Sequence, residues 1–494
     1  MAPGHRFFLM IKENFLLLIN FGTMVWYRKI VEDIIIVRIL IRGGMSPFDN
    51  FSATKEILED TFGGNAGNMV YLYSIFRILM TEGTEIDLDY YRPERGQTSS
   101  REIDEINEKY DLYIIPLADA FRSSFVPSLK RLTNFVEKLK IRVVVIGSGM
   151  KIPMGEDVTE AHSYDKEVKR FAKAVLKRSA IFGVRGENTE KYLKNLGFSG
   201  SEVRAIGCPS LYFHGSQLPL RSVPQDFGKQ SKLIVTNSMI TSAEIHEFMR
   251  KITDSFDNYV FVPQLRRELN ELYYGMPYRA KGYPYPINIS DKIFRAGKAR
   301  FFLNVPTWIE HNSKADLSVG PRLHGNIASM LGGTPSLILM KDGRMQELVD
   351  FHNLTHISMN DLKPDTDLID IVHKSDFNSI NSVHEANFRN FVDFLKENRV
   401  ASIYDDADHA ENTPFDKRIK EIEFNDPVIP YSACDMEEII KRCNEFFPAQ
   451  EKYINGLHRD SAYKRAYERF MPGFITDEEG WGHKFIMKRA GYKE

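Results

Sequence analysis

The chain has 494 residues, of which 43% are hydrophobic and 27% are charged. These fractions are typical of a soluble globular protein, and the length predicts two or more domains. The formal net charge of -2 argues against nonspecific binding to a polyanion, so we expect no nucleic-acid partner.

The three cysteines, Cys208, Cys434 and Cys443, show neither a CxxC spacing nor a histidine at metal-ligand spacing. The sequence therefore indicates neither a disulfide framework nor a zinc site, and we expect no bound metal. Unpaired thiols are typical of a reducing compartment, so the expected location is the cytoplasm.

The N-terminal segment 6–42 is unusually apolar and rich in basic residues. Its longest uncharged run, 14–27, is too short to span a bilayer and lacks the small-residue cleavage site of a secretory signal. One interpretation is a helix and a strand docked on the body. Another is peripheral contact with the inner face of a membrane, and a third is an extension ahead of a start at Met45. We assign residues 1–45 to an N-terminal apolar and basic extension.

In residues 46–222, short apolar runs alternate with segments of helical spacing. Buried strands are predicted at 111–116, 142–146, 180–184 and 203–206, and helices at 69–80, 126–139 and 187–196. A tight glycine-rich loop precedes the first of these helices, with Asn68 as its predicted N-cap. Strands that alternate with helices predict a mostly parallel sheet with right-handed crossovers.

The pattern restarts after a polar stretch at 215–231, where we place the domain boundary. Strands are predicted at 232–236, 259–263, 301–305, 317–320 and 336–340, and helices at 325–331 and 383–396. Residues 46–222 thus form a first domain, and residues 223–406 form a second. The predicted fold class is α/β, with two doubly wound Rossmann-like domains facing a cleft, as in glycosyltransferase B folds.

The C-terminal residues 407–494 are charged and aromatic, with a helix predicted at 436–447. We expect this helical extension to pack back on the body, because its aromatic side chains are too many for a solvated tail. They include Phe415, Phe446, Phe447, Tyr453, Tyr463, Tyr467, Phe470, Phe474 and Trp481.

The most informative stretch of the chain is 317–348. Arg322, Leu323 and His324 lie where a predicted strand gives way to a helix, and Arg344 follows the next strand. In open α/β sheets such corners face the crevice that binds ligands, and the helix N-terminus also attracts an anion. The cluster therefore predicts an anion-binding site with a titratable imidazole. The alternative is a buried histidine with surface arginines.

Four segments of the chain resemble the polysaccharide pyruvyltransferase family. They read GGNAGN at 63–68, VVVIGSG at 143–149, IFGVRGENTEKYLKNLG at 181–197 and GPRLHGNIASMLGGTP at 320–335. The last segment, in this order after the others, is the most specific. The resemblance spans about 61–350 and leaves both terminal segments outside it.

The resemblance implies transfer of pyruvate from phosphoenolpyruvate to a sugar of a polysaccharide or of its lipid-linked precursor. The product is a cyclic ketal, and phosphate is released. It also implies a donor site that contains Arg185, Arg322, Leu323 and His324. The family usually has a lysine where this chain has Arg344, which keeps the charge but alters the geometry.

One position departs further from the family pattern. Family members often carry an acid before the proline that follows the next strand, and this chain has Cys208 there. No role is transferred to that position.

The chemistry supports the same residues independently. Phosphoenolpyruvate carries close to three negative charges, which Arg185, Arg322 and Arg344 would neutralise. His324 is the predicted general acid for the methylene carbon, because an imidazole donates protons near neutral pH. Asp119, at a strand end in the first domain, is the candidate base for the sugar hydroxyl. A loop or helix-capping aspartate is its alternative role.

The first domain, 46–222, is the predicted acceptor side, and the second domain, 223–406, is the predicted donor side. Within the first domain, the acceptor is predicted to bind at the glycine-rich loop. Asn65, Gly67 and Asn68 are expected there, although a plain tight turn explains these residues equally well. Phosphoenolpyruvate is expected as a co-substrate, with no resident cofactor. The acceptor sugar, its lipid carrier and homo-oligomerisation are left open by the sequence.

Two other classes of function are compatible with this architecture. The first is a nucleotide-sugar-dependent glycosyltransferase, but such enzymes usually place an acid in the helix corresponding to 325–331, which contains none. The second is an inactive scaffold or carbohydrate-binding protein. The presence of Arg185, Arg322 and His324 together argues against it.

Overall fold

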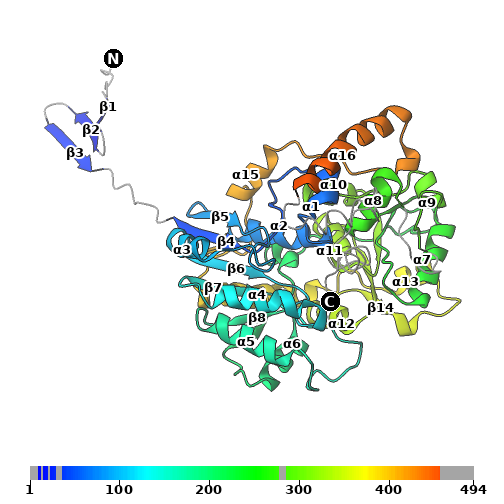
Figure 1. Ribbon diagram of the computed structural model, residues 1–494, viewed down its shortest axis with the longest axis horizontal. Coiled ribbons are helices and arrows are strands. Elements are labelled where there is room, and N and C mark those ends of the chain that lie inside the picture. The colour runs from blue at the N-terminus through cyan, green and yellow to red at the C-terminus, as the bar shows by residue number, and fades with distance from the viewer. Residues whose placement is uncertain (1–8, 13–14, 21–22, 29–35, 277–284, 457–494) are drawn as a thin grey trace, which may run out of the picture.

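The computed structural model describes residues 9–12, 15–20, 23–28, 36–276 and 285–456. Two α/β halves lie side by side in this part of the chain, the first in blue to cyan and the second in green to yellow (Figure 1). The predicted fold class, two doubly wound Rossmann-like halves, is confirmed.

The first half contains a parallel sheet in the order β5-β4-β6-β7. A bridge from Ser148 to Val184 extends it to the parallel pair β8-β9. The strands are β4 (Val37–Ile41), β5 (Thr84–Leu88), β6 (Leu112–Pro116), β7 (Arg142–Ile146), β8 (Phe182–Val184) and β9 (Val203–Ala205). The inner strands are buried on both faces because helices cover the sheet on both sides, as is usual for parallel sheets.

The second half contains a parallel sheet in the order β11-β10-β12-β13-β14. Its strands are β10 (Leu233–Val235), β11 (Tyr259–Phe261), β12 (Leu317–Gly320), β13 (Ser336–Met340) and β14 (His356–Ser358). The strand order reverses between β4 and β6 in the first half and between β10 and β12 in the second. Ligands bind outside the carboxyl ends of strands at such switch points.

The connecting helices cover both sheets. In the first half they are α1 (Ala53–Glu59), α2 (Gly67–Leu79), α3 (Ser100–Lys109), α4 (Val126–Val136), α5 (Asp165–Leu176) and α6 (Glu187–Asn195). In the second half they are α7 (Ala243–Ser255), α8 (Arg266–Tyr274), α9 (Lys292–Arg295), α10 (Val305–Asn312), α11 (Leu323–Leu331), α12 (Gly343–His352) and α13 (Leu368–Lys374). Short 3₁₀-helices lie at Ser123–Phe125, Pro209–His214, Met359–Asp361 and Tyr431–Ala433.

Helix α14 (Asn381–Glu397) follows the second half in sequence but packs on the first. The Asn390 side chain donates a hydrogen bond to the Ala205 carbonyl at 2.8 Å, next to β9. Beyond the helix, the Asn398 side chain donates to the Ile181 carbonyl at 3.1 Å. The chain thus crosses back to the first half within the segment that we assigned to the second domain, 223–406.

The N-terminal segment differs from the prediction. The described residues there form an antiparallel sheet of β1 (Leu9–Lys12), β2 (Phe15–Asn20) and β3 (Thr23–Arg28), so the predicted helix is wrong. Each apolar run there has the length of a strand rather than of a helix. Strand β4 pairs with β5 and β6, so the first sheet begins at Val37, inside the segment 1–45 that we assigned to an extension.

The strand predicted at 301–305 is also wrong. Phe301 makes only an isolated bridge to Val428. Helix α10 begins at Val305, because the Asn304 side chain accepts a hydrogen bond from the Thr307 backbone and caps it.

Among the residues that the structure describes, no helix combines the length and the apolar character needed to span a membrane.

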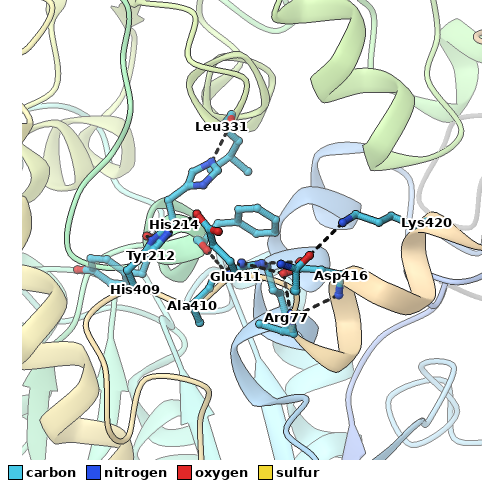
Figure 2. A network of polar contacts seen from close by, with 12 residues as sticks. Arg77, Tyr212, His214, Leu331, His409, Ala410, Glu411, Asp416 and Lys420 are labelled. Atoms are coloured by element: carbon cyan, nitrogen blue, oxygen red, sulfur yellow. Dashed lines mark hydrogen bonds and ion pairs between the residues drawn. The ribbon is translucent and has the colours of Figure 1, made fainter.

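The C-terminal segment packs on the body as far as it is described. Helix α15 (Pro414–Lys420) contacts α2, and α16 (Met436–Gly456) lies over α1 and α8 (Figure 1). Buried Arg77 of α2 pairs with Asp416 of α15 at 2.8 Å and donates to the Ala410 carbonyl at 2.6 Å (Figure 2). The predicted contacts of Tyr463, Tyr467, Phe470, Phe474 and Trp481 fall outside the described residues.

We expect Arg77→Met to lower the free energy of unfolding by about 3 kcal/mol, because it leaves the Asp416 carboxylate mostly buried without its partner. Urea denaturation followed by circular dichroism measures this change. The matched control is Lys417→Met on α15, the helix of Asp416; the exposed pair of Lys417 with Glu82 should contribute less than about 1 kcal/mol. Equal effects of the two substitutions would contradict the anchoring role of Arg77.

Candidate active site

An aspartate joins the two halves at the carboxyl ends of their sheets. Asp119 follows β6, and its carboxylate accepts a hydrogen bond from Arg185 Nη1 at 2.7 Å. Arg344, in the first turn of α12, pairs with the other carboxylate oxygen from the opposite half. Sequence reasoning named all three residues, and the fold brings them together.

Both arginines act on the ionisation of Asp119. Burial by itself would raise the pKa of this carboxyl, but the guanidinium groups of Arg344 and Arg185 hold it below its usual range. Asp119 is therefore an ionised counter-ion. Arg185 is only 2% exposed, and its Nε and Nη2 groups have no hydrogen-bond partner among the described residues. Buried donors without a partner are rare in folded proteins, so these two nitrogens are candidates for contact with a ligand.

Arg322 approaches from the second sheet. It occupies the N-cap position of α11, directly after β12 and Pro321, and its Nε donates to the Asn237 carbonyl at 3.3 Å. Its Nη2 lies 3.6 Å from Glu268 Oε1. The other oxygen of Glu268 accepts the backbone N–H groups of Gln264 and Leu265, both at 2.8 Å, so this carboxylate is fixed in place. Arg322 is thus positioned by the loop after β10 and by the first turn of α8.

His324 is partly buried where α2 meets α11. Its Cβ would lie 3.0 Å from a Cβ added at Gly67, so only glycine allows this close approach of the two helices. The imidazole packs edge-on against Tyr71 at 5.9 Å, and its Nε2 lies 3.8 Å from the Cys208 thiol. Burial, reinforced by the charge of Arg185, lowers the pKa of His324 to about 3. The ring is therefore neutral at pH 7.

Leu323, which precedes His324, has a packing role in the structure. Leu323 is partly buried and packs against the apolar core. The structure therefore gives it a packing contact near the site, and its predicted place at the donor stays a prediction.

Sequence reasoning missed Lys341, which follows β13 directly. Its ammonium donates to Ser238 Oγ at 3.2 Å and to the Ile240 carbonyl at 2.7 Å. Burial and the charges of Arg322 and Arg344 lower its pKa to about 7. The available signal was its position, one residue beyond the predicted strand 336–340 and three before Arg344.

A cleft of about 620 Å³ adjoins this cluster. Asp119 lies in its wall, as do Asn65 and Asn68 of the glycine-rich loop, and the second half contributes Ile240 and the segment 265–267. The predicted N-cap role of Asn68 is wrong. The residue lies inside α2 and its side chain donates to the Phe62 carbonyl at 3.0 Å, because the helix already begins at Gly67.

The described residues contain no candidate set of metal ligands. No group of three His, Cys, Asp or Glu side chains there is arranged to hold a metal ion. The positive charges of the site come instead from arginine and lysine.

The sequence profile of the polysaccharide pyruvyl transferase family matches residues 65–342, more than half of the chain. The chain belongs to this family. It is therefore a pyruvyltransferase enzyme, and membership implies a pyruvyl donor and a sugar acceptor. The matched range of this pyruvyltransferase includes Asp119, Arg185 and the Arg322-Leu323-His324 triplet, and it ends two residues before Arg344.

Other proteins are only distantly similar to this pyruvyltransferase. Among solved structures, S. aureus MnaA with UDP is 12% identical, with a TM-score of 0.39 over 73% of this chain and 96% of its own. The UDP-GlcNAc 2-epimerase of Neisseria meningitidis is 12% identical, with a TM-score of 0.39 over 73% and 100%. Anabaena Alr3699/HepE with UDP and glucose is 12% identical, with a TM-score of 0.37 over 74% and 97%. No curated protein matches the pyruvyltransferase in sequence.

We expect the ring of His324 to stay neutral from pH 8 to pH 5 in the ligand-free enzyme, because its pKa is lowered to about 3. Nuclear magnetic resonance of ¹⁵N-histidine-labelled protein, assigned with His324→Asn, measures its titration. Exposed His409 is the internal control, since hydrogen bonds to the His214 carbonyl and Glu411 raise its pKa above 6.5. A His324 midpoint near 6.5 would refute the buried, neutral state.

Proposed function

We propose that the enzyme transfers pyruvate from phosphoenolpyruvate to a sugar of a polysaccharide or of its lipid-linked precursor, forming a cyclic ketal and releasing phosphate. The observation that carries this proposal is the buried guanidinium of Arg185, with two unpartnered N–H groups among the described residues, beside Arg344 and His324. The reaction would belong to exopolysaccharide synthesis in the cytoplasm, with membrane contact and homo-oligomerisation as further expectations.

The donor fits the charges of the site. Phosphoenolpyruvate has a phosphate and a carboxylate, and planar guanidinium groups bind both with paired, charge-assisted hydrogen bonds. Arg185, Arg322 and Arg344 supply three such groups, and Lys341 supplies a fourth positive charge when protonated. In the absence of donor, Asp119 holds Arg185 and Arg344 in place, so little reorganisation is needed when the donor binds.

Proton transfer begins at the methylene carbon of the donor. His324 donates the proton while a sugar hydroxyl attacks the central carbon, and a second hydroxyl then displaces phosphate. The donor's negative charge offsets Arg185 and Arg344, which lower the pKa of His324 in the free enzyme. Binding of the donor therefore raises this pKa and favours the protonated imidazole that the reaction needs.

The base for the attacking hydroxyl is a separate question. Asp119 remains a prediction for this role, but its two arginine partners make its carboxylate a weak base. Lys341 is a second candidate, because its pKa is lowered to about 7 in the free enzyme and because Ile240, whose carbonyl it binds, lines the cleft. The site favours pyruvyl transfer over a nucleotide-sugar-dependent glycosyltransferase, because α11 contains no acidic residue that could bind the ribose of a nucleotide.

Phosphoenolpyruvate should raise the melting temperature of the purified enzyme, because a ligand that binds the native state stabilises it. UDP-N-acetylglucosamine at the same concentration should raise it less. Differential scanning fluorimetry with both compounds, and with Arg322→Gln as the binding-deficient control, measures the difference. A shift with the nucleotide-sugar and none with phosphoenolpyruvate would overturn the donor assignment.

His324→Ala and Arg322→Ala should separate turnover from donor binding. His324→Ala should lower kcat by about 10²–10⁴-fold with little change in phosphoenolpyruvate affinity, because proton donation acts in the transition state. Arg322→Ala should weaken donor affinity by about tenfold or more, since a charge-assisted contact is lost in both states. A phosphate-release assay gives kcat and KM, and calorimetry gives the affinity. Near-normal turnover of His324→Ala would rule out this histidine as the acid.

A further inference from the structure

We infer that the cleft beside the donor cluster binds a phosphate or diphosphate ester carried by the acceptor sugar. The inference deepens the proposed function and rests on it only for the statement that the bound sugar is the one that receives pyruvate. The anion site itself rests on the charges that line the cleft.

Positive charge dominates the cleft wall. Six arginines and three carboxylates line it. Two of the carboxylates are engaged, since Glu94 pairs with Arg42 through two hydrogen bonds of 2.6 and 2.9 Å, and Asp119 pairs with Arg185 and Arg344 of the donor cluster. The third, Asp60, lies 4.0 Å from Arg266.

Three of the lining arginines, which we call the cleft arginines, have only neutral acceptors: Arg95, Arg122 and Arg131. No carboxylate of the described residues lies within ion-pair distance of them. Arg95 donates to the Asp60 carbonyl at 3.4 Å, and Arg131 donates to the Glu94 carbonyl and to Ser128 Oγ. Arg95 and Arg131 therefore have no carboxylate partner among the described residues, and Arg122 acts on the Asp119 carboxylate only from beyond ion-pair distance.

The cleft arginines are neighbours in space. Arg131 binds the carbonyl of Glu94, the residue before Arg95, so these two guanidiniums share one wall. Arg122 donates to the backbone carbonyl of Asp119, which places it at the end of the cleft next to the donor cluster. A ligand that contacts Arg122 thus lies close to the reacting groups, and Arg95 and Arg131 lie further along the same cleft.

The N-terminus of α4 adds to this field. Phe125, its N-cap residue, and Ser128 in its first turn line the cleft, and no side chain caps the helix. An 11-residue helix carries partial positive charge at this end, which favours a phosphate group. Three guanidiniums without an ion-pair partner among the described residues, together with this helix end, match the two or more charges of a diphosphate better than the single charge of a carboxylate.

The volume of the cleft fits a substrate of this size. At about 620 Å³ it lies within the range of small-molecule sites and accommodates a sugar together with its phosphate groups. The same chemistry is found in a lipid-linked sugar diphosphate and in a nucleoside diphosphate sugar. Both sources are therefore compared in the test below.

The test uses the full-length enzyme and inorganic pyrophosphate, titrated by calorimetry at low salt. The variant Arg95→Gln with Arg131→Gln should weaken pyrophosphate binding by about tenfold or more and leave phosphoenolpyruvate affinity within about twofold of wild type. Arg322→Gln should show the opposite pattern. A charge-matched control, Arg101→Gln with Arg389→Gln, changes two exposed arginines outside the cleft and should alter neither affinity.

The outcomes separate this inference from the donor assignment. Pyrophosphate affinity within twofold of wild type in the Arg95 and Arg131 variant would overturn the anion site, whatever phosphoenolpyruvate does. If the wild-type enzyme binds pyrophosphate but not phosphoenolpyruvate, the donor assignment is wrong and the anion site stands. Glucuronate that competes better than pyrophosphate would also overturn the phosphate assignment.

Competition with UDP and with farnesyl diphosphate then identifies the source. Stronger competition by farnesyl diphosphate supports a lipid-linked acceptor, and stronger competition by UDP supports a nucleotide-linked one. Equal competition supports recognition of the diphosphate alone. Circular dichroism of each variant shows that it is folded, and the exposed positions of Arg95 and Arg131 make that the expected result.

Discussion

The Asp119 carboxylate, held between Arg185 and Arg344, is the interaction on which the site depends. Arg185 comes from the first half and Arg344 from the second, so this carboxylate links the two sheet edges. A buried charge is stable only with partners, and here each partner is also a potential ligand for an anion. The ion pairs therefore hold the halves together and keep two guanidiniums oriented toward the same space.

The same cluster controls the ionisation of its neighbours. Several buried cations in one place disfavour further positive charge, so the pKa of His324 is lowered to about 3 and that of Lys341 to about 7. An anionic substrate reverses this effect because it offsets the cations. In the proposed mechanism a bound donor thus favours the protonated form of His324, which links proton donation to donor binding.

Segments distant in sequence support this arrangement. Helix α14 returns from the second half to β9, and the Arg77–Asp416 pair ties α15 to α2. Helix α2 in turn carries Gly67 and Tyr71, which contact His324. The C-terminal segment therefore stabilises the helix against which the central histidine packs, although it contributes no residue to the ion-pair cluster.

The sequence by itself determined the strand-helix alternation, because apolar period and turn residues are local properties. It placed β6, β7, β12 and β13 within a residue or two, and it predicted Arg185, Arg322 and His324 as site residues from their positions after strands. It did not find the strands β1, β2 and β3, and it predicted a strand at 301–305 although Asn304 caps a helix there. Only the tertiary structure decided which charges meet: Asp119 with two arginines, Lys341 beside Arg322, and three arginines of the cleft without carboxylates. Those pairings depend on long-range contacts between the two sheets, whose effects on burial and pKa no local pattern encodes.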